Sequence, residues 1–235
     1  MPLTDQTRAA AREIIARYPK ARSALLPMLH LVQSEEGYVS PAGIALCAEE
    51  LELTKAEVAA VATFYSMYKR RPAGDYHVGV CTNTLCAVLG GDAIFDSLKE
   101  HLGVGHNETT PDGKVSLEHI ECNAACDFAP VVMVNWEFYD NQTPQSAREL
   151  VDALRGGNPP APTRGPDSLC TFKQVSRLLA GFDDGRSGEG VAAGPATLIG
   201  LDIAKQRGDD APPYSSPPSS DDNDADSGAA DAREG

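Results

Sequence analysis

The stretches CTNTLC, at residues 81–86, and CNAAC, at residues 122–126, decide the fold of this chain. Three or four residues between paired cysteines let the backbone turn back, so that both sulfurs of a pair can reach one metal ion. Two such loops side by side would present four thiolates to one centre. Four thiolates are the ligand set of a [2Fe-2S] cluster or of a structural zinc ion.

Two other uses of paired cysteines fit this sequence less well. The first twenty residues, MPLTDQTRAAAREIIARYPK, contain no apolar signal core, which argues against a secreted disulfide scaffold. A thioredoxin-type redox pair normally has two residues between its cysteines, and both spacings here are longer. Zinc remains the serious competitor, because zinc loops tolerate spacings within or near these.

The residues between the cysteines favour iron over zinc. Most of them are small or carry an amide: Thr82, Asn83, Thr84, Asn123, Ala124 and Ala125. Small residues let backbone N–H groups approach the bridging sulfides of an iron–sulfur cluster, and a zinc site has no sulfides to bind. Neither loop contains lysine or arginine, so we expect backbone N–H donors to offset the negative charge of a reduced centre.

Strand and helix patterns alternate around the two cysteine loops. Residues 76–80 predict a short strand leading into Cys81, and residues 88–102 carry apolar residues at helical spacing. Strands are predicted at 115–120 and 131–136, and a helix begins at Thr143-Pro144 and ends at Gly156-Gly157. This β-α-β-β-α order predicts a thioredoxin-like α/β domain over residues 73–157, with both cysteine pairs at one end of its sheet.

The preceding residues, 1–72, predict a helical bundle, which makes the fold class α+β. Helix-start signals occur at Thr4, at Ser40-Pro41 and in the capping box Thr54-x-x-Glu57. A further helix is expected from about Ser23 to Gln33. Cys47 falls within an apolar helix of this bundle and is most simply a buried small residue.

Three segments together resemble a known family. They are CTNTLCAVLGG from Cys81, CNAACDFAP from Cys122 and LLPMLHLVQ from Leu25. They resemble the E subunits of bacterial NADH-quinone oxidoreductases, the thioredoxin-like, 24 kDa-type subunits of respiratory complex I. The resemblance covers about residues 10–155. Family members often carry glycine where Ala124 stands and proline near Leu85, and these departures concern loop stiffness rather than ligands.

The resemblance implies a role for each cysteine of the two loops. Cys81, Cys86, Cys122 and Cys126 would ligate one [2Fe-2S] cluster, with one pair on each iron. The chain would be the electron-transfer subunit of the complex. It would lie in the cytoplasmic peripheral arm, beside a flavin- and NADH-binding subunit and a large iron–sulfur subunit. FMN and NADH are expected on the partner subunit only, because this sequence has no G-x-G-x-x-G after a strand and no Walker motif. The isolated chain is therefore expected to have no catalytic activity.

Other functions remain compatible with the residues alone. The chain could be the equivalent [2Fe-2S] subunit of an NAD-linked hydrogenase or formate dehydrogenase, a free-standing thioredoxin-like ferredoxin, or a zinc-stabilised binding module. A freely diffusing ferredoxin has little use for a helical bundle and a C-terminal arm. These two extensions therefore favour a subunit of a large assembly.

Charge and hydropathy exclude two classes of partner. The formal net charge is −14, so nucleic acid is an improbable partner. No apolar run is long enough for a transmembrane helix, so direct membrane insertion is not expected. The five histidines are scattered without metal-ligand spacing, and His119 is the one that stands close enough in sequence to Cys122 to contact the centre.

The composition changes after Gly156. Residues 158–207 begin with a proline-rich linker and are predicted to be an arm that docks on partner subunits. One short helix is expected near residues 170–179, and residues 188–200 read as irregular. The apolar stripe of the helix near residues 170–179 would face the partner. This stripe consists of Phe172, Val175, Leu178 and Leu179. Residues 208–235 are rich in aspartate, serine and proline and are predicted to be a disordered acidic tail.

Overall fold

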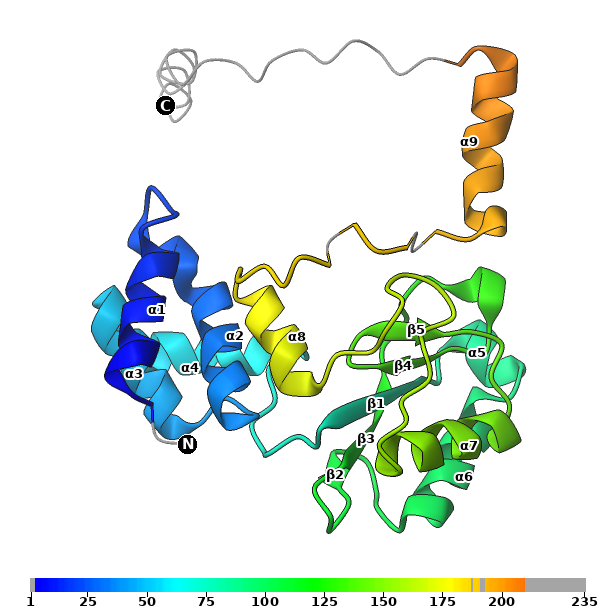
Figure 1. Cartoon of the computed structure of the whole chain (residues 1–235), viewed down its shortest axis with the longest axis horizontal. Helices are drawn as coiled ribbons and strands as arrows, with labels where there is room; N and C mark the ends of the chain where they lie inside the picture. The colour runs from blue at the N-terminus through cyan, green and yellow to red at the C-terminus, as the bar shows by residue number, and fades with distance from the viewer. Residues whose placement is uncertain (1–2, 187, 191–192, 210–235) are drawn as a thin grey trace, which may run out of the picture. The chain divides into compact units, whose positions relative to one another are not determined.

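The computed structural model describes residues 3–186, 188–190 and 193–209, and it divides into two units, residues 1–194 and 195–235 (Figure 1). Apart from residues 208 and 209, the predicted acidic tail lies outside the described residues. The first unit contains the helical bundle and the sheet, and the described residues of the second, 195–209, contain the helix α9 Pro195–Arg207. Within the described part of the chain, no helix has both the length and the apolarity needed to cross a bilayer.

The N-terminal bundle forms as its capping signals predict. Its elements are α1 Asp5–Ile15, η1 Ala21–Ala24, α2 Leu25–Glu36, α3 Pro41–Leu51 and α4 Lys55–Phe64. Thr4, Ser40 and Thr54 are the N-caps of α1, α3 and α4, and each side chain accepts a hydrogen bond from a backbone N–H of the first turn. These bonds satisfy N–H groups that the start of a helix leaves without partners.

The bundle core centres on α2, whose apolar residues Met28, Leu29, Leu31 and Val32 are fully buried. Helix α3 packs closely against α2, because a Cβ on Gly43 would lie 2.2 Å from a methyl carbon of Val32. Cys47 of α3 is buried as expected, and burial raises the pKa of its thiol to about 12.

The second part of the first unit is a five-stranded sheet with helices on one face. Its strands are β1 Tyr76–Cys81, β2 Glu108–Thr109, β3 Val115–Ile120, β4 Val132–Val134 and β5 Glu137–Tyr139. The strand order is β2-β3-β1-β4-β5, in which β1 and β3 are parallel and the other pairs antiparallel. The helices of this domain are α5 Thr84–Val88, α6 Gly91–Leu102 and α7 Pro144–Arg155.

The core of this domain lies between the sheet and the neighbouring helices α6 and α7 (Figure 1). Alternate residues of β1 and β3 face these helices and are fully buried, among them Val78, Val80, Val115 and Leu117. The opposite face carries the other set, which begins with His77 on β1 and ends with Cys81. This alternation confirms the thioredoxin-like α/β arrangement predicted from the sequence.

Two elements differ from the sequence prediction at positions where the backbone enters the left-handed region. The strand predicted over residues 131–136 is two strands, because Asn135 and Trp136 turn with φ values of 49° and 68°. The Asn135 side chain holds this turn by accepting a hydrogen bond from the His77 N–H at 2.7 Å and donating one to the Cys170 carbonyl at 2.8 Å. The helix predicted over residues 88–102 begins later, as α6 at Gly91, after Gly90 with a φ of 110°, and α5 is a separate short helix that was not predicted.

The C-terminal segment forms the helix predicted near residues 170–179 and a further helix that was not predicted. Helix α8, Phe172–Leu179, lies beside α2 of the bundle (Figure 1), and Phe172 and Val175 are buried. The expectation that Phe172 and Val175 face a partner is therefore wrong, because this chain covers them itself. In the second unit, α9 begins at Pro195 and ends at Arg207, within a stretch that was expected to be irregular up to residue 200. Proline at the first position of a helix is favourable, since its missing N–H needs no partner there.

Phe172 packs the start of α8 against the sheet, and its removal should be costly. Its ring packs 5.4 Å from the Trp136 ring and 6.2 Å from the His77 ring, measured between centroids, and the side chain is fully buried. We expect Phe172→Ala to lower the free energy of unfolding by about 3–5 kcal/mol in urea denaturation. Leu179→Ala, at a position 39% exposed, is the matched control and should cost about 1 kcal/mol or less. Equal losses from both variants would contradict the packing role of Phe172.

Candidate metal centre

The parallel pairing of β1 and β3 brings the two cysteine loops together. Cys81 is the last residue of β1 and pairs in register with Ile120, the last residue of β3. Cys122 follows two residues later. Because parallel strands end at the same edge of a sheet, both loops leave the sheet side by side, as the sequence predicts.

All four cysteines of these loops line one cavity of about 310 Å³. Its other lining residues come from the same two loops and the start of the next strand: Asn83, Thr84, Leu85, Asn123, Ala125 and Val131. Cys81 and Cys86, which lies in α5, are buried, whereas Cys122 and Cys126, which begins the short helix η2 Cys126–Phe128, are exposed. The cavity therefore has one enclosed pair of thiols and one pair at the surface.

The four thiols are close enough to affect one another's protonation. Burial raises the pKa of Cys86 to about 11, with further upward contributions from Cys81 and Cys126. Burial also raises the pKa of Cys126, and the neighbouring Cys122 adds to this shift. The neighbouring thiolates thus disfavour ionisation of Cys86 and Cys126, and the positive charge of bound cations would offset this repulsion. Two ferric ions supply such charge, and the donor set therefore fits a binuclear iron centre.

A sulfur of each loop accepts a hydrogen bond from a backbone N–H group. The Ala124 N–H donates to Cys122 Sγ at an N···S distance of 3.3 Å, and the Val131 N–H lowers the pKa of Cys86 by donating to its sulfur. Ala124 adopts a φ of 53°, in the left-handed region that favours glycine. Alanine there costs roughly 1 kcal/mol more than glycine would. Both loops lack lysine and arginine, and these donors agree with the expectation that backbone N–H groups offset the negative charge of the centre.

The ligand loop 81–86 is packed against the start of α6. A Cβ on Gly91 would lie 2.5 Å from the Cys81 carbonyl oxygen and 2.9 Å from the Cys86 carbonyl oxygen, so only glycine fits there. The Asn83 side chain donates to the Ile120 carbonyl at 3.0 Å and so ties this loop to the strand that leads to the second one. Gly91 thus permits close backbone packing between the loop and α6.

Sequence reasoning missed a residue that supports the second loop. Arg164, from the segment predicted as a docking arm, lies over the Phe138 ring at 3.7 Å and over the Phe128 ring at 5.1 Å. The Arg164 guanidinium also donates to both carboxylate oxygens of Asp140, at 3.0 and 3.3 Å. Phe128 is the last residue of η2, which begins at Cys126. The signal that could have found Arg164 is a lone arginine shortly after a proline-rich linker, which by itself is weak.

The remaining candidates lie away from the cavity. His119 stacks on His106 with ring centroids 4.1 Å apart, and its backbone N–H donates to His106 Nδ1. Cys47 lies inside the bundle, and Cys170 is half-buried near Asp184, with 3.9 Å between sulfur and oxygen. Across the described ranges, no three Cys, His, Asp or Glu side chains converge on the position of a single ion. The four cysteines instead share the cavity as two adjacent pairs.

Comparison with known proteins gives consistent matches. The family model for thioredoxin-like [2Fe-2S] ferredoxins matches residues 11–155. The chain is 68% identical over 204 residues to the E subunit of the NADH-quinone oxidoreductase of Mycobacterium tuberculosis, covering 86% of this chain and 81% of the relative. It is 39% identical over 160 residues to NADH-quinone oxidoreductase subunit 2 of Thermus thermophilus, covering 67% of this chain and 88% of the relative.

A solved structure supports the fold. An NAD⁺-reducing [NiFe]-hydrogenase in its air-oxidised state superposes with a TM-score of 0.52 at 20% identity, over 57% of this chain and 23% of the hydrogenase chain. At this level of identity the likeness shows a shared fold and nothing about activity.

The contact at Gly91 yields a prediction about the ligand loop. We expect Gly91→Ala to push the Cys81 and Cys86 carbonyls apart, to cost about 1–3 kcal/mol of stability and to reduce bound iron in the purified protein. Iron analysis and visible absorption measure the effect. Gly200→Ala is the matched control, because an added Cβ there meets nothing within 4 Å. Full iron content in Gly91→Ala would show that the loop does not need this close approach.

Proposed function

Because the chain belongs to the thioredoxin-like [2Fe-2S] ferredoxin family, among the E subunits of NADH-quinone oxidoreductases, we propose that it is the electron-transfer subunit of such a complex. The observation that carries this proposal is the single cavity lined by Cys81, Cys86, Cys122 and Cys126. Four thiols around one cavity at the end of a sheet can hold one [2Fe-2S] cluster. The chain would exchange single electrons with the flavin of a partner NADH-binding subunit.

Each pair of cysteines would hold one iron. Cys81 and Cys86 form the enclosed pair, and Cys122 and Cys126 form the pair nearer the surface. When bound, a [2Fe-2S] cluster accepts and releases one electron at a time. The chain's own contribution is to fix the four sulfurs and to direct N–H groups at them, as Ala124 does at Cys122, so that the added negative charge is stabilised.

The surface around the cavity suits a protein partner. Three apolar side chains of α5 and the residue after it are exposed beside the cysteines: Leu85 by 41%, Val88 by 78% and Leu89 by 53%. Contiguous exposed apolar residues mark interaction sites in proteins. A partner docked over them would stand next to the exposed Cys122 and Cys126, which is the arrangement that short-range electron transfer to a flavin requires.

The remaining features of the proposal follow from the family. FMN and NADH would be held by the partner flavoprotein, with the large iron–sulfur subunit as a second neighbour. The assembly would place this chain in the peripheral arm on the cytoplasmic side of the membrane. The part of the arm beyond α8, residues 180–207, would contact these partners, and its α9 exposes Ile199 and Leu201. An NAD⁺-reducing hydrogenase shares the fold of this chain, but no further observation favours a role in such an enzyme.

The ligand assignment predicts the metal content of the chain. Anaerobically purified protein should hold about two irons and two sulfides per chain and give a spin-half EPR signal after reduction with dithionite. Replacing Cys81, Cys86, Cys122 or Cys126 singly with serine should weaken or abolish this signal. Cys47→Ala and Cys170→Ser are the controls and should keep it. Stoichiometric zinc without labile sulfide, or equal loss from all six replacements, would reject the assignment.

The proposed partnership predicts how the centre is reduced. The isolated chain should not oxidise NADH, because its sequence contains no nucleotide-binding motif of a recognised type. When the chain is mixed with the flavin- and NADH-binding subunit, addition of NADH should bleach the visible absorption of its centre. Dithionite bleaching of the isolated chain is the control for an intact centre. Bleaching by NADH without the partner would contradict the proposal.

A further inference from the structure

Two aromatic side chains are exposed at the end of the helical bundle, far from the cysteines in the sequence. Phe64, the last residue of α4, is 80% exposed, and Tyr65 is 45% exposed. They begin the connector, residues 64–73, which leads from α4 to β1. Burying one such ring contributes about 1.5–3 kcal/mol, so a partner that covers these two adjacent rings gains binding free energy.

The Phe64 and Tyr65 rings are positioned by contact with the buried Tyr68 ring. The Phe64 and Tyr65 rings meet edge to face with centroids 4.9 Å apart, and Tyr65 meets the Tyr68 ring at 6.1 Å. Tyr68 is only 7% exposed, and its hydroxyl donates to the Leu26 carbonyl of α2 at 2.9 Å. The exposed rings are therefore held in place by a buried one, and little side-chain freedom is left to lose when a partner binds.

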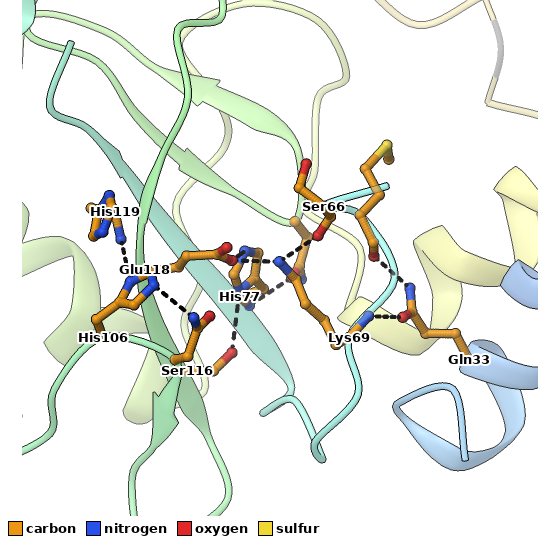
Figure 2. Close-up of polar contacts among 11 residues, drawn as sticks. Gln33, Ser66, Lys69, His77, His106, Ser116, Glu118 and His119 are labelled. Atoms are coloured by element: carbon orange, nitrogen blue, oxygen red, sulfur yellow. Dashed lines mark hydrogen bonds and ion pairs between the residues drawn. The ribbon is translucent and has the colours of Figure 1, made fainter. Parts of the chain in front are cut away.

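The rest of the connector is tied down on both sides (Figure 2). From α2, the buried Gln33 donates to the Met67 carbonyl at 3.2 Å and accepts from the Lys69 N–H at 2.8 Å. From the sheet, Glu118 forms an ion pair with the Lys69 ammonium and also contacts His77 Nε2 at 2.9 Å. The hydrogen bond from His77 and the charge of Lys69 outweigh burial and lower the pKa of Glu118 to about 2. Lys69 is thus already neutralised by a carboxylate of this chain.

The next two residues of the connector have no such carboxylate. Within the described residues, the side chains of the exposed Arg70 and Arg71 make no hydrogen bond, ion pair or ring contact. Both line a cavity of about 480 Å³ together with Tyr65 and Lys69, and the one acidic residue in its lining is Glu118. Two unpaired positive charges on a chain of net charge −14 form a local region of opposite sign.

We propose that Phe64, Tyr65, Arg70 and Arg71, with the adjoining cavity, form a docking surface for an acidic segment of a partner subunit. Aromatic residues and arginine carry most of the binding energy in protein interfaces, and arginine binds carboxylates through two parallel hydrogen bonds. The aromatic pair would bury apolar side chains of the segment, and the arginines would bind its Asp or Glu residues. This inference rests on the proposed function, because it requires an assembly with partner chains.

The docking surface is distinct from the mouth of the cysteine cavity. Lys69 of the connector pairs with Glu118, which stands opposite Gly79 of β1, two residues before Cys81, and the two cavities share no lining residue. A partner segment bound here leaves Cys122 and Cys126 accessible to the flavin-bearing surface. Two separate contacts would fix the orientation of the chain, and hence the distance from its centre to the flavin.

The test compares charge reversals on the full chain. Arg70→Glu/Arg71→Glu removes the basic surface, and Lys20→Glu/Lys55→Glu makes the same charge change at two other exposed positions of the bundle. The aromatic control for Phe64→Ala is Tyr18→Ala, because the Tyr18 side chain is 39% exposed. The probe is the tagged flavin-binding subunit coexpressed with the large iron–sulfur subunit. Affinity for each variant is measured at low and high salt, and the thermal midpoint and iron content confirm that each variant is folded and loaded.

We expect Arg70→Glu/Arg71→Glu and Phe64→Ala each to weaken binding about tenfold or more, with a reduced salt dependence for the arginine variant. The two controls should stay within about twofold of the unmodified chain. Folded, loaded variants that bind as well as their controls would overturn the docking surface and leave the proposed function standing. An unmodified chain that binds neither partner would overturn both. If the arginine variant instead separates a dimer of this chain, the occupant is a second copy and the inference is wrong.

Discussion

The parallel hydrogen bonding between β1 and β3 is the interaction on which the rest of the structure depends. It places Cys81 opposite Ile120, and so delivers two loops that are distant in sequence to one edge of the sheet. An antiparallel pairing would put these loops at opposite ends of the strands, and four sulfurs could not share one cavity. The helices α6 and α7 stabilise this pairing by burying one face of both strands.

Bringing four thiols together imposes a cost that the surrounding residues offset. Burial and mutual repulsion raise the pKa values of Cys86 and Cys126, so these thiols resist full ionisation. N–H groups directed at the sulfurs reduce this cost, but they require unusual backbone positions, such as the left-handed Ala124. Gly91 lets α6 pack against the first cysteine loop more closely than a residue with a Cβ would allow.

A second polar network joins the bundle to the sheet. Gln33 holds the connector from the bundle, and Glu118 holds Lys69 and His77 from the sheet. Buried charges of this kind are retained only where every partner is satisfied, because an unpaired member would cost several kcal/mol. Fixing the connector has a further effect: it presents Phe64 and Arg70 at a defined place relative to the cysteine loops.

The sequence alone determined the parts that depend on local chemistry. Helix starts could be predicted at Thr4, Ser40 and Thr54, because an N-cap hydrogen bond joins residues only three apart. The cysteine spacing predicted two metal-binding loops for the same reason, since each loop is a local turn. Tertiary structure decided the rest. The burial of Phe172 against its own chain, the clamp of Arg164 on Phe128 and the tie between Lys69 and Glu118 each join residues far apart in sequence. No local pattern encodes such contacts, because they arise only when packing brings distant segments to the same place.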